Sequence, residues 1–335
     1  MEYINRNGKK ISRMTLGSAQ LGMNYGIANN TGKPSAERCA EMLRFAREAG
    51  ITSIDTAGAY GDSETLLGKY LSDTEANSPP PYITTKIQLG FGKPTGGGVT
   101  LPADDLNTFR AGFDALGDGA EKTVFDLAEA SLDRLKIRKA DCIMLHSPYE
   151  MAAGGARLAR IMGRLVTAGY ADEVGVSLYL PHEAGEMMKY EEYTAVQLPV
   201  SVFDQKMILS GTLRKLRQRD ILVFVRSVFL QGVFFLEPES MEDPLLIEHA
   251  RPHVAKLRLL AEREGISVAQ MALSFVRDAY GAGSLVLGCD GIGQITENVA
   301  LMDGPRIGEE SMEAIKSEFG GVNIDGIMVV LRRAK

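Results

Sequence analysis

Short apolar runs rich in β-branched residues recur along the chain, and each has the length of a strand rather than of a helix. Most are followed by a longer segment in which apolar residues repeat every three to four positions. Alternating strand and helix patterns predict an α/β protein with a parallel sheet. Eight strands are predicted, at Met14–Gly17, Ile51–Asp55, Tyr82–Lys86, Asp141–His146, Glu173–Ser177, Ala195–Pro199, Ile221–Arg226 and Ser284–Gly288.

The segment after the first predicted strand shows the helical pattern. Ser35 is a suitable N-cap, and Gly50 can end a helix because glycine tolerates the left-handed conformation. Between them lies one apolar face, made of Cys39, Met42, Leu43, Ala46 and Ala49. Comparable stripes predict further helices, including one that begins at Pro181 and two between the seventh and eighth strands, before Gly265 and after Ser267.

Eight strand-and-helix units without a break in composition indicate a closed barrel, formed by a single domain over residues 1–335. We therefore predict a (β/α)8 TIM barrel with a long loop after the third strand and an extra helix between the seventh and eighth. A doubly wound open sheet is the alternative. It fits less well, because the turn at 17–22 lacks the glycine spacing of a dinucleotide fingerprint and the chain has no Walker loop.

Three segments lie outside the barrel pattern. Residues 1–13 are predicted to form a small N-terminal cap under the barrel. Residues 90–119 are rich in glycine and proline and would lie over the barrel mouth, where active sites of this fold occur. This mouth loop fits a floppy insertion and a substrate lid equally well. Residues 320–335 hold an apolar stretch closed by basic residues, which fits a packed C-terminal tail or an interface strand.

The composition is globular, with 45% hydrophobic and 24% charged residues and a formal net charge of −6. A mildly acidic chain with few basic clusters is a poor partner for nucleic acid or an anionic membrane. No signal-peptide stretch opens the chain, and the most apolar run, 221–236, is too short to span a bilayer. Cys39, Cys142 and Cys289 are far apart without metal-ligand spacing, so we expect a cytoplasmic protein and no metal site.

Polar residues at the ends of neighbouring strands are the candidates for chemistry. Asp55, Lys86 and His146 end the second, third and fourth strands, and Tyr60 lies five residues after Asp55. Each has an ordinary structural explanation when taken singly: a helix cap, a solvent-exposed lysine, a structural histidine, a packed tyrosine. On successive strands of one barrel, however, their side chains would converge at one mouth.

This set of four is chemically coherent. A tyrosine hydroxyl has a pKa near 10, and a neighbouring ammonium lowers that pKa by favouring the charged phenolate. A carboxylate would hold the lysine charged and in place, and a neutral histidine would donate a hydrogen bond to a substrate oxygen. The arrangement predicts a proton donor directed at a carbonyl oxygen, as carbonyl reduction requires.

Several motifs, in this order along the chain, match one known family. They are Leu16–Gly22, Ile54–Ala57 with Tyr60–Gly61, Thr84–Lys86, Ser131–Leu135 before Leu145–Pro148, Gly175–Ser177 and Gln294–Asn298. With them the chain resembles the aldo-keto reductase superfamily, whose members are (β/α)8 barrels that use a nicotinamide cofactor. The stretches Leu16–Ala28, Val225–Ser227 and Gln231–Gly232 resemble a branch associated with bacterial carbohydrate and polysaccharide pathways.

The resemblance implies roles for the candidate residues. Tyr60 would be the general acid–base, Lys86 and Asp55 would tune it, and His146 would orient the carbonyl. The cofactor would lie extended across the mouth, with its nicotinamide amide near Ser177 and its adenosine end at 288–298. The implied cofactor-binding residues are Ser18, Ala19, Gln20, Asp55, Ser177, Gln197, Arg226, Ser227, Phe229, Gly232, Gly288, Cys289, Gln294, Glu297 and Asn298.

Three positions depart from the family pattern. Leu178 stands where members usually carry Asn, and Arg226 stands where many carry an aromatic residue against the nicotinamide. The stretch 288–294 has no cation for an adenosine 2′-phosphate and contains Asp290, which favours a 2′-hydroxyl. The family pattern favours NADP(H) and the local charge NAD(H). We expect NADP(H) by a small margin, because a Lys or Arg from elsewhere in the chain can reach the site.

We therefore expect an NAD(P)H-dependent oxidoreductase that reduces an aldehyde or ketone. The absence of Trp mildly favours a polar, sugar-like small-molecule substrate over an apolar one. A nicotinamide-binding regulatory or redox-sensing protein with little turnover is the alternative, and Leu178 and Arg226 keep it open. A metal-dependent sugar isomerase is disfavoured, because the strand ends lack clustered carboxylate and histidine ligands.

Overall fold

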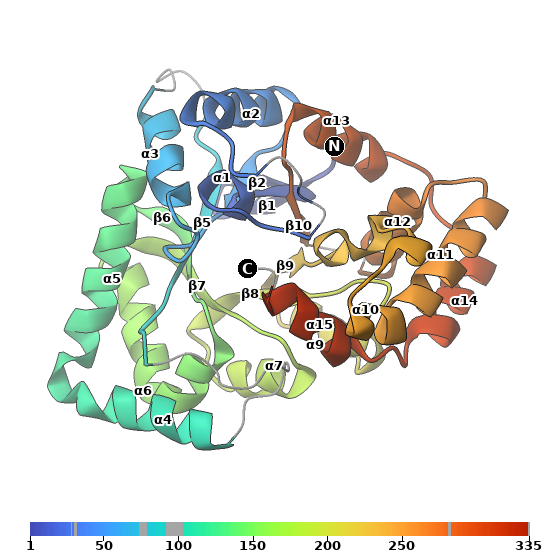
Figure 1. Ribbon diagram of the computed structural model, residues 1–335. Coiled ribbons are helices and arrows are strands. Elements are labelled where there is room, and N and C mark those ends of the chain that lie inside the picture. The colour runs from blue at the N-terminus through green and yellow to red at the C-terminus, as the bar shows by residue number, and fades with distance from the viewer. Residues whose placement is uncertain (28, 30–31, 74–78, 92–102, 281–282, 334–335) are drawn as a thin grey trace.

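The computed structural model describes residues 1–27, 29, 32–73, 79–91, 103–280 and 283–333. Parallel strands pair in the order β10-β3-β4-β5-β6-β7-β8-β9 and close into a barrel surrounded by helices (Figure 1). The predicted (β/α)8 TIM barrel is therefore confirmed. The barrel strands are β3 Met14–Gly17, β4 Ser53–Asp55, β5 Tyr82–Ile87, β6 Ala140–Leu145, β7 Ala171–Ser177, β8 Tyr193–Pro199, β9 Leu222–Arg226 and β10 Ser284–Gly288.

The period-2 alternation of the strands determines which side chains enter the barrel. Tyr82 at the start of β5 packs near Phe224 of β9, with ring centroids 6.1 Å apart. These rings belong to a buried cluster that is separate from the main core. Lys86 lies four residues after Tyr82, and Arg226 lies two residues after Phe224. Their side chains therefore point to the same face as the Tyr82 and Phe224 rings, but lie closer to the carboxyl ends of the strands.

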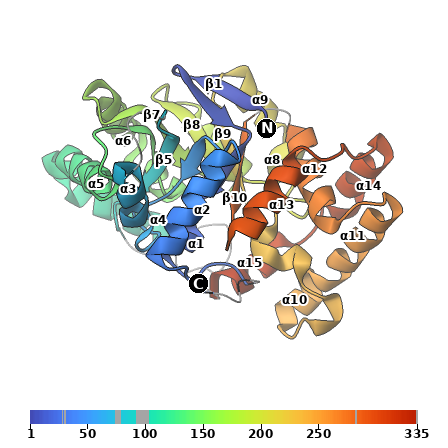
Figure 2. The same cartoon turned by 90° about the horizontal axis from the view of Figure 1, so that it is seen from above.

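A two-stranded antiparallel hairpin, β1 Tyr3–Arg6 and β2 Lys9–Ser12, precedes the barrel. Ile11 is fully buried in the cluster with Tyr82 and Phe224. Two ion pairs tie the hairpin to the barrel: Arg6 to Glu173 at 2.7 Å and Lys9 to Asp141 at 2.5 Å. Figure 2 shows β1 at the opposite end of the barrel from the C-terminal helix α15 Ile324–Arg333.

Helices surround the strands and supply the outer half of the core. The predicted cap of the second helix is present, since the Ser35 hydroxyl accepts a hydrogen bond from Arg38 N. The other helices and 3-10 turns are α1 Ala19–Gly22, α2 Ala36–Glu48, α3 Ser63–Asp73, α4 Ala103–Ala115, η1 Gly117–Gly119, α5 Ala120–Leu135, α6 Pro148–Thr167, α7 Pro181–Met187, α8 Lys206–Leu209, α9 Thr212–Gln218, η2 Leu230–Phe235, η3 Pro238–Ser240, α10 Pro244–His249, α11 Arg251–Arg263, α12 Val268–Tyr280, α13 Ile292–Met302 and α14 Glu309–Phe319.

The prediction of a loop throughout residues 90–119 was wrong. Helix α4 occupies 103–115, and η1 follows it. Phe109 and Phe113, one helical turn apart, are buried, and the Phe109 ring lies 5.8 Å from that of Tyr149 on α6. This short apolar stripe was obscured by the glycines before it. The glycine-rich half, 92–102, lies outside the described residues, so the choice between insertion and lid stays open.

Two other segments also differ from expectation. The C-terminal apolar stretch forms helix α15 and not an interface strand, because Ile324, Ile327 and Leu331 fall on one helical face and are buried. The packed tail is thus the correct alternative for the described part of 320–335, and α15 packs against α10. Three helices, α10 to α12, lie between the last two barrel strands where two were predicted.

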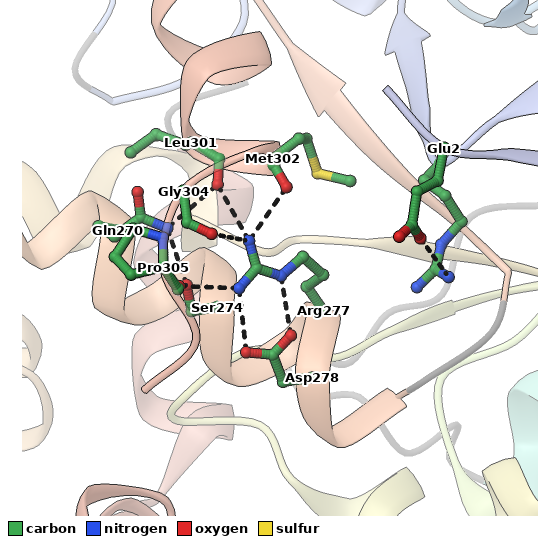
Figure 3. Close-up of polar contacts among 10 residues, drawn as sticks. Glu2, Gln270, Ser274, Arg277, Asp278, Leu301, Met302, Gly304 and Pro305 are labelled. Atoms are coloured by element: carbon green, nitrogen blue, oxygen red, sulfur yellow. Dashed lines mark hydrogen bonds and ion pairs between the residues drawn. The ribbon is translucent and has the colours of Figure 1, made fainter. Parts of the chain in front are cut away.

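A partly buried arginine, Arg277, fixes the position of α13 (Figure 3). The Arg277 guanidinium donates hydrogen bonds to the carbonyls of Met302, Gly304 and Pro305, at 2.8 to 3.0 Å, and pairs with Asp278 at 2.8 Å. These carbonyls belong to the carboxyl end of α13 and the turn after it, where helices have unpaired acceptors and partial negative charge. Arg277 therefore fixes the helix whose other end faces the candidate site.

Candidate active site

Asp55 and Lys86 form a buried ion pair at the centre of the mouth. Asp55 is the last residue of β4 and pairs with Thr84, so Lys86, two residues further along β5, lies on the same face as Thr84. Lys86 Nζ donates to both Asp55 oxygens, at 2.7 and 2.8 Å, and to the Thr56 carbonyl at 3.0 Å. Gln197 Nε2 donates to Asp55 Oδ1 at 2.8 Å. The carboxylate and the ammonium are therefore both fixed in position.

Tyr60 and His146 meet this pair. Lys86 Nζ lies 3.3 Å from the Tyr60 hydroxyl oxygen, within hydrogen-bond range. The His146 ring stands edge-on to the Tyr60 ring, with centroids 5.6 Å apart. His146 follows β6, where its backbone N–H donates to the Ile87 carbonyl at 2.9 Å. The structure thus brings together all four side chains that the sequence placed at the strand ends.

The direction of the tyrosine pKa differs from the expectation. Burial, followed by the negative charge of Asp55, raises the pKa of Tyr60 above its usual range. Burial also lowers the pKa of Lys86, against the opposing effect of Asp55. The lysine charge is neutralised locally by Asp55, so its effect on the phenol does not outweigh desolvation. Tyr60 therefore keeps its proton at neutral pH and can act as a hydrogen-bond donor.

A chain of hydroxyl groups positions the loop that carries Tyr60. Ser63 donates to the Ser18 hydroxyl at 2.6 Å, and Ser18 donates to the Asp55 carbonyl at 2.8 Å. Ser18 was predicted as a cofactor contact, and it also holds the end of β4. Gly22 makes this close packing feasible, since a Cβ there would lie 1.8 Å from the Tyr60 carbonyl oxygen.

A cavity of about 330 Å³ extends from Tyr60 to the amino end of α13. Most predicted cofactor residues line it: Ser18, Ala19, Gln20, Asp55, Gln197, Arg226, Ser227, Phe229, Gly232, Gly288, Gln294, Glu297 and Asn298. Ser177 and Cys289 do not. Ser177 is buried beside Gln197, with which it pairs across β7 and β8. Cys289 lies behind the wall, where Asn298 Nδ2 contacts its sulfur at 3.3 Å, and burial raises the pKa of the Cys289 thiol to about 12.

Several other residues that line the cavity were not predicted as site residues from the sequence. Tyr25 and Asn29 belong to the segment between α1 and α2, and Gln231 and Phe235 belong to η2. The two segments meet where Ile27 N donates to the Gln231 carbonyl at 3.2 Å. Tyr25 and Gln231 fall in stretches that carry the narrower resemblance, but no motif gives them a role in the site, because their place in the wall depends on how two loops cross. Gln231 has a positive φ of 54°, so this turn is held in a strained conformation.

Arg226 and Leu178, two of the departures from the family pattern, contact each other. Arg226 Nη2 donates to the Leu178 carbonyl at 3.1 Å. The guanidinium carbon lies 4.7 Å from the centroid of the Tyr179 ring, in a cation–π contact. The Leu178 side chain itself is fully buried in the core. The chain therefore presents a cation at a position where an aromatic residue was expected.

The end of the cavity at α13, where the resemblance implies the adenosine of the cofactor, carries opposed charges. Asp290 N donates to Gln294 Oε1 at 2.7 Å, and Gln294 Nε2 donates to Asp290 Oδ2 at 3.2 Å. The other carboxylate oxygen, Asp290 Oδ1, is buried and has no hydrogen-bond partner among the described residues. Arg38 lies nearby on α2, its Nη2 3.7 Å from where a Cβ at Gly291 would stand. The stretch 288–294 has no cation of its own, but α2 supplies one.

These features fit an extended dinucleotide. The cavity has glycine in its wall at Gly26, Gly232 and Gly288, and it reaches the α13 amino terminus, where Gly291 provides no side-chain cap for the free backbone donors. Helix amino termini bind phosphate well because such donors and the helix dipole favour negative charge. Among the described residues, no group of three or more His, Cys, Asp or Glu is arranged to hold a metal ion. The described residues also contain no helix with the length and hydropathy of a membrane span.

Together these observations define a (β/α)8 barrel with a candidate proton donor beside a cavity that extends to the amino end of α13. The sequence matches the model of the aldo/keto reductase family over residues 13–318, so the chain belongs to that family and the resemblance is confirmed. It is 23% identical to L-glyceraldehyde 3-phosphate reductase of Escherichia coli O157:H7, over 93% of this chain and 90% of the relative. The chain spans about half the length of other curated relatives that it matches.

Solved structures of family members share the fold. The glycerol dehydrogenase AKR11B4 from Gluconobacter oxydans is similar with a TM-score of 0.69 at 20% identity, covering 94% of each chain. An aldo-keto reductase from Klebsiella pneumoniae, solved in complex with NADPH, is similar with a TM-score of 0.63 at 18% identity, covering 93% of this chain and 92% of that one. At such identity, the likeness shows the barrel and leaves substrate preference to the residues of the site.

Proposed function

We propose that this protein is an NAD(P)H-dependent oxidoreductase that reduces an aldehyde or ketone to an alcohol. The observation that carries the proposal is the contact of the Tyr60 hydroxyl with Lys86, beside His146 and at one end of the cavity that reaches α13. A protonated phenol at the mouth of a barrel is suited to protonate a carbonyl oxygen as the carbon is reduced.

In this mechanism Tyr60 delivers the proton, and the surrounding groups position the tyrosine and the substrate. A reduced nicotinamide, when bound in the cavity, supplies the hydride. His146, at the rim beside Tyr60, holds the substrate oxygen by a hydrogen bond. As the phenol releases its proton, the fixed ammonium of Lys86 stabilises the phenolate at 3.3 Å. Asp55 and Gln197 keep Lys86 in place throughout the reaction.

We further propose a small preference for NADP(H). The support is Arg38, which brings a cation to the amino end of α13, where the 2′-phosphate of NADP(H) would lie. Asp290 opposes it, since its unpartnered oxygen would repel a phosphate and accept a bond from a ribose hydroxyl. The two charges act against each other, so we expect NADH to bind measurably as well.

The substrate proposed is a small polar carbonyl compound, such as a sugar or a sugar-derived aldehyde. Two relatives are named for related chemistry, L-glyceraldehyde 3-phosphate reductase and glycerol dehydrogenase. The narrower resemblance of Val225–Ser227 and Gln231–Gly232 to a carbohydrate-pathway branch points the same way. We also propose a cytoplasmic location, which the three free, buried cysteines support.

The test is the Tyr60→Phe variant. It removes the proton donor and leaves the ring in place, so turnover of a panel of aldehydes and sugars should fall about 10²–10⁴-fold. The dissociation constants for NADPH and NADH, measured by fluorescence titration, should change little. Near-native turnover in the variant would refute the assigned role. Tight dinucleotide binding by the wild type without oxidation by any carbonyl compound would favour the regulatory alternative.

A further inference from the structure

Arg226 places a positive charge at the catalytic end of the cavity. It is the last residue of β9 and lines the cavity together with Tyr60. Its charge acts on the reaction centre, because it lowers the pKa of Tyr60, although burial outweighs that effect. Lys86 and Arg226 thus contribute two cations to this end, and Asp55 is bound to Lys86.

No carboxylate compensates Arg226 among the residues that the structure describes, where it forms no ion pair. The pKa values of Glu183 and Asp204 are both affected by the charge of Arg226. Both acids are engaged elsewhere: Glu183 accepts the backbone N–H of Tyr179 at 2.7 Å, and Asp204 pairs with Lys206 at 3.5 Å. A cation without a counter-ion in a partly enclosed cavity is costly unless a ligand neutralises it.

A second arginine reaches the same ring from the other end of the chain. The guanidinium carbon of Arg332, on α15, lies 5.9 Å from the centroid of Tyr179, the ring that Arg226 also contacts. Tyr179 stacks on Tyr149, with centroids 6.5 Å apart, and the charge of Arg332 lowers the pKa of Tyr149. Figure 1 shows α15 near the axis of the barrel in projection, and Figure 2 shows it at the end of the barrel opposite β1. Both arginines thus gather at Tyr179 above the catalytic phenol.

We propose that the substrate carries an anionic group, a carboxylate or a phosphate. Arg226 and Arg332, the two arginines that contact the Tyr179 ring, bind this group. The inference rests on the proposed function and narrows it to anionic carbonyl compounds. Guanidinium groups suit this role because their planar fork matches both oxyanions bidentately. Neutral aldehydes would still reach Tyr60 but would bind without this contact.

The first experiment compares matched aldehydes. Benzaldehyde and 4-carboxybenzaldehyde test a carboxylate, and glyceraldehyde and glyceraldehyde 3-phosphate test a phosphate. The wild type should prefer the charged member of one or both pairs about 10-fold or more in kcat/KM, and the pair with the larger ratio identifies the anion. Equal kcat/KM within both pairs would overturn the inference and leave the proposed function intact.

Variants then locate the anion site. Arg332→Met should lower the charged-to-neutral ratio about 10-fold, through KM, with the neutral aldehyde little affected. Arg333→Met is the matched control, since Arg333 is exposed on the same helix and loses the same charge. It should leave the ratio unchanged. An equal effect of the two variants would show a general charge effect and would contradict the assignment.

Arg226→Gln separates the substrate from the cofactor. The charged-to-neutral ratio should fall about 10–100-fold, whereas Arg226→Lys should retain part of it. The dissociation constants for NADPH and NADH are measured by fluorescence in the same variants, because Arg226 also lines the proposed cofactor cavity. A fall in the ratio that exceeds any rise in those constants assigns the guanidinium to the substrate. A large rise in those constants with an unchanged ratio would mean that Arg226 binds the dinucleotide, and the inference would fail.

A direct binding measurement distinguishes failure of the anion-site inference from failure of the proposed function. 4-(Hydroxymethyl)benzoate and benzyl alcohol are the products of reducing 4-carboxybenzaldehyde and benzaldehyde, and their affinity can be measured by calorimetry without turnover. The benzoate should bind more tightly, and Arg332→Met should remove the difference. If no aldehyde is reduced but this difference is present, the proposed function fails and the anion site stands. If the two alcohols bind alike, the anion site is wrong.

Discussion

The proposed catalytic end of the cavity, at Tyr60, and its proposed adenosine end, at α13, hold their charges in different ways. At the catalytic end, the Asp55 carboxylate receives two bonds from Lys86 and one from Gln197, all from buried side chains. At the adenosine end, Asp290 keeps one buried oxygen without a hydrogen-bond partner among the described residues, and Arg38 pairs with Glu41 at the surface. Within the first end, the group formed by Asp55, Lys86 and Gln197 completes its own electrostatics and so dictates its residue types, whereas Arg226 is left for a ligand. The second end leaves the charge of Asp290 for a ligand to satisfy, so its residues can vary with the ligand.

Removing Lys86 should give the largest effect, because the catalytic end depends on it twice. Lys86→Met leaves Asp55 buried with Gln197 as its remaining side-chain donor, which should destabilise the fold by about 3–5 kcal/mol. It also removes the cation beside Tyr60, so kcat should fall about 10²–10³-fold. Urea unfolding and steady-state kinetics at saturating cofactor measure the two effects.

The double variant Asp55→Asn/Lys86→Met separates structure from chemistry. Without the unpaired carboxylate, most of the lost stability should return, but kcat should remain low because the ammonium is still absent. Recovery of both stability and activity would show that the pair serves only the fold. The contrast drawn above between the two ends would then disappear.

A second buried carboxylate, which does not line the cavity, lacks the cationic partner that Asp55 has. Glu150, in the first turn of α6, accepts the backbone N–H of Leu89 at 2.5 Å, and its other oxygen has no hydrogen-bond partner among the described residues. Burial raises the pKa of Glu150 to about 7, against an ordinary value of 4.5. Between those two pH values the folded protein keeps a proton that the unfolded chain releases. Stability should therefore fall as pH rises through this window, by roughly 3 kcal/mol in total, and then level off.

Glu150→Gln should flatten that profile, because the amide does not titrate. The free energy of unfolding, measured by urea titration at pH 5, 6, 7 and 8, should lose most of its decline in the variant. Glu129→Gln, at an exposed position on α5, is the control and should follow the wild type. A variant profile as steep as that of the wild type would show that Glu150 titrates normally in the folded protein.

The fold was predictable because the barrel repeats one local rule. Each strand is short, apolar and followed by a helix with a clear stripe, so eight strands could be located within about two residues of their observed bounds. Failures occurred where local composition conceals the pattern. Glycines next to α4 obscured the buried pair Phe109 and Phe113, and the valines in 327–331 suggested a strand where α15 forms.

The site was predictable to different extents at its two ends. Asp55, Lys86 and His146 follow from their positions at strand ends, because parallel strands bring those ends together. Tyr25 could not be found, because a crossing loop carries it into the cavity wall. Arg38 could not be found either, because a helix on the outside of the barrel brings it near Gly291. The pKa direction of Tyr60 also escaped prediction, since it depends on how far burial outweighs a nearby, already neutralised charge.

The support of the adenosine end can be tested at Arg277, with a smaller effect. Arg277→Met leaves the carbonyls of Met302, Gly304 and Pro305 without this donor and Asp278 without its partner, which should cost about 2–3 kcal/mol of stability. Because α13 loses its anchor, the dissociation constant for NADPH should rise several-fold while kcat at saturation changes little.

Arg263→Met, at an exposed position on α11, is the control for Arg277. It should change neither the free energy of unfolding nor the NADPH affinity by a measurable amount. If Arg277→Met lowered kcat as much as it weakened NADPH binding, the two ends would be coupled through α13, and treating them separately would be wrong.

The smallest effect is expected for the cation on the rim. Arg38→Ala should raise the dissociation constant for NADPH about 10-fold and leave that for NADH unchanged, because only NADPH carries a 2′-phosphate for the guanidinium to bind. Asp290→Ser should act in the opposite direction, tightening NADPH by removing a like charge. Arg47→Ala, which removes the same charge from the far end of α2, is the matched control. Fluorescence titration with both cofactors measures these dissociation constants. If Arg38→Ala weakens the binding of NADH and NADPH equally, Arg38 does not contact the 2′-phosphate. The charge of Asp290 would then set the cofactor preference toward NAD(H).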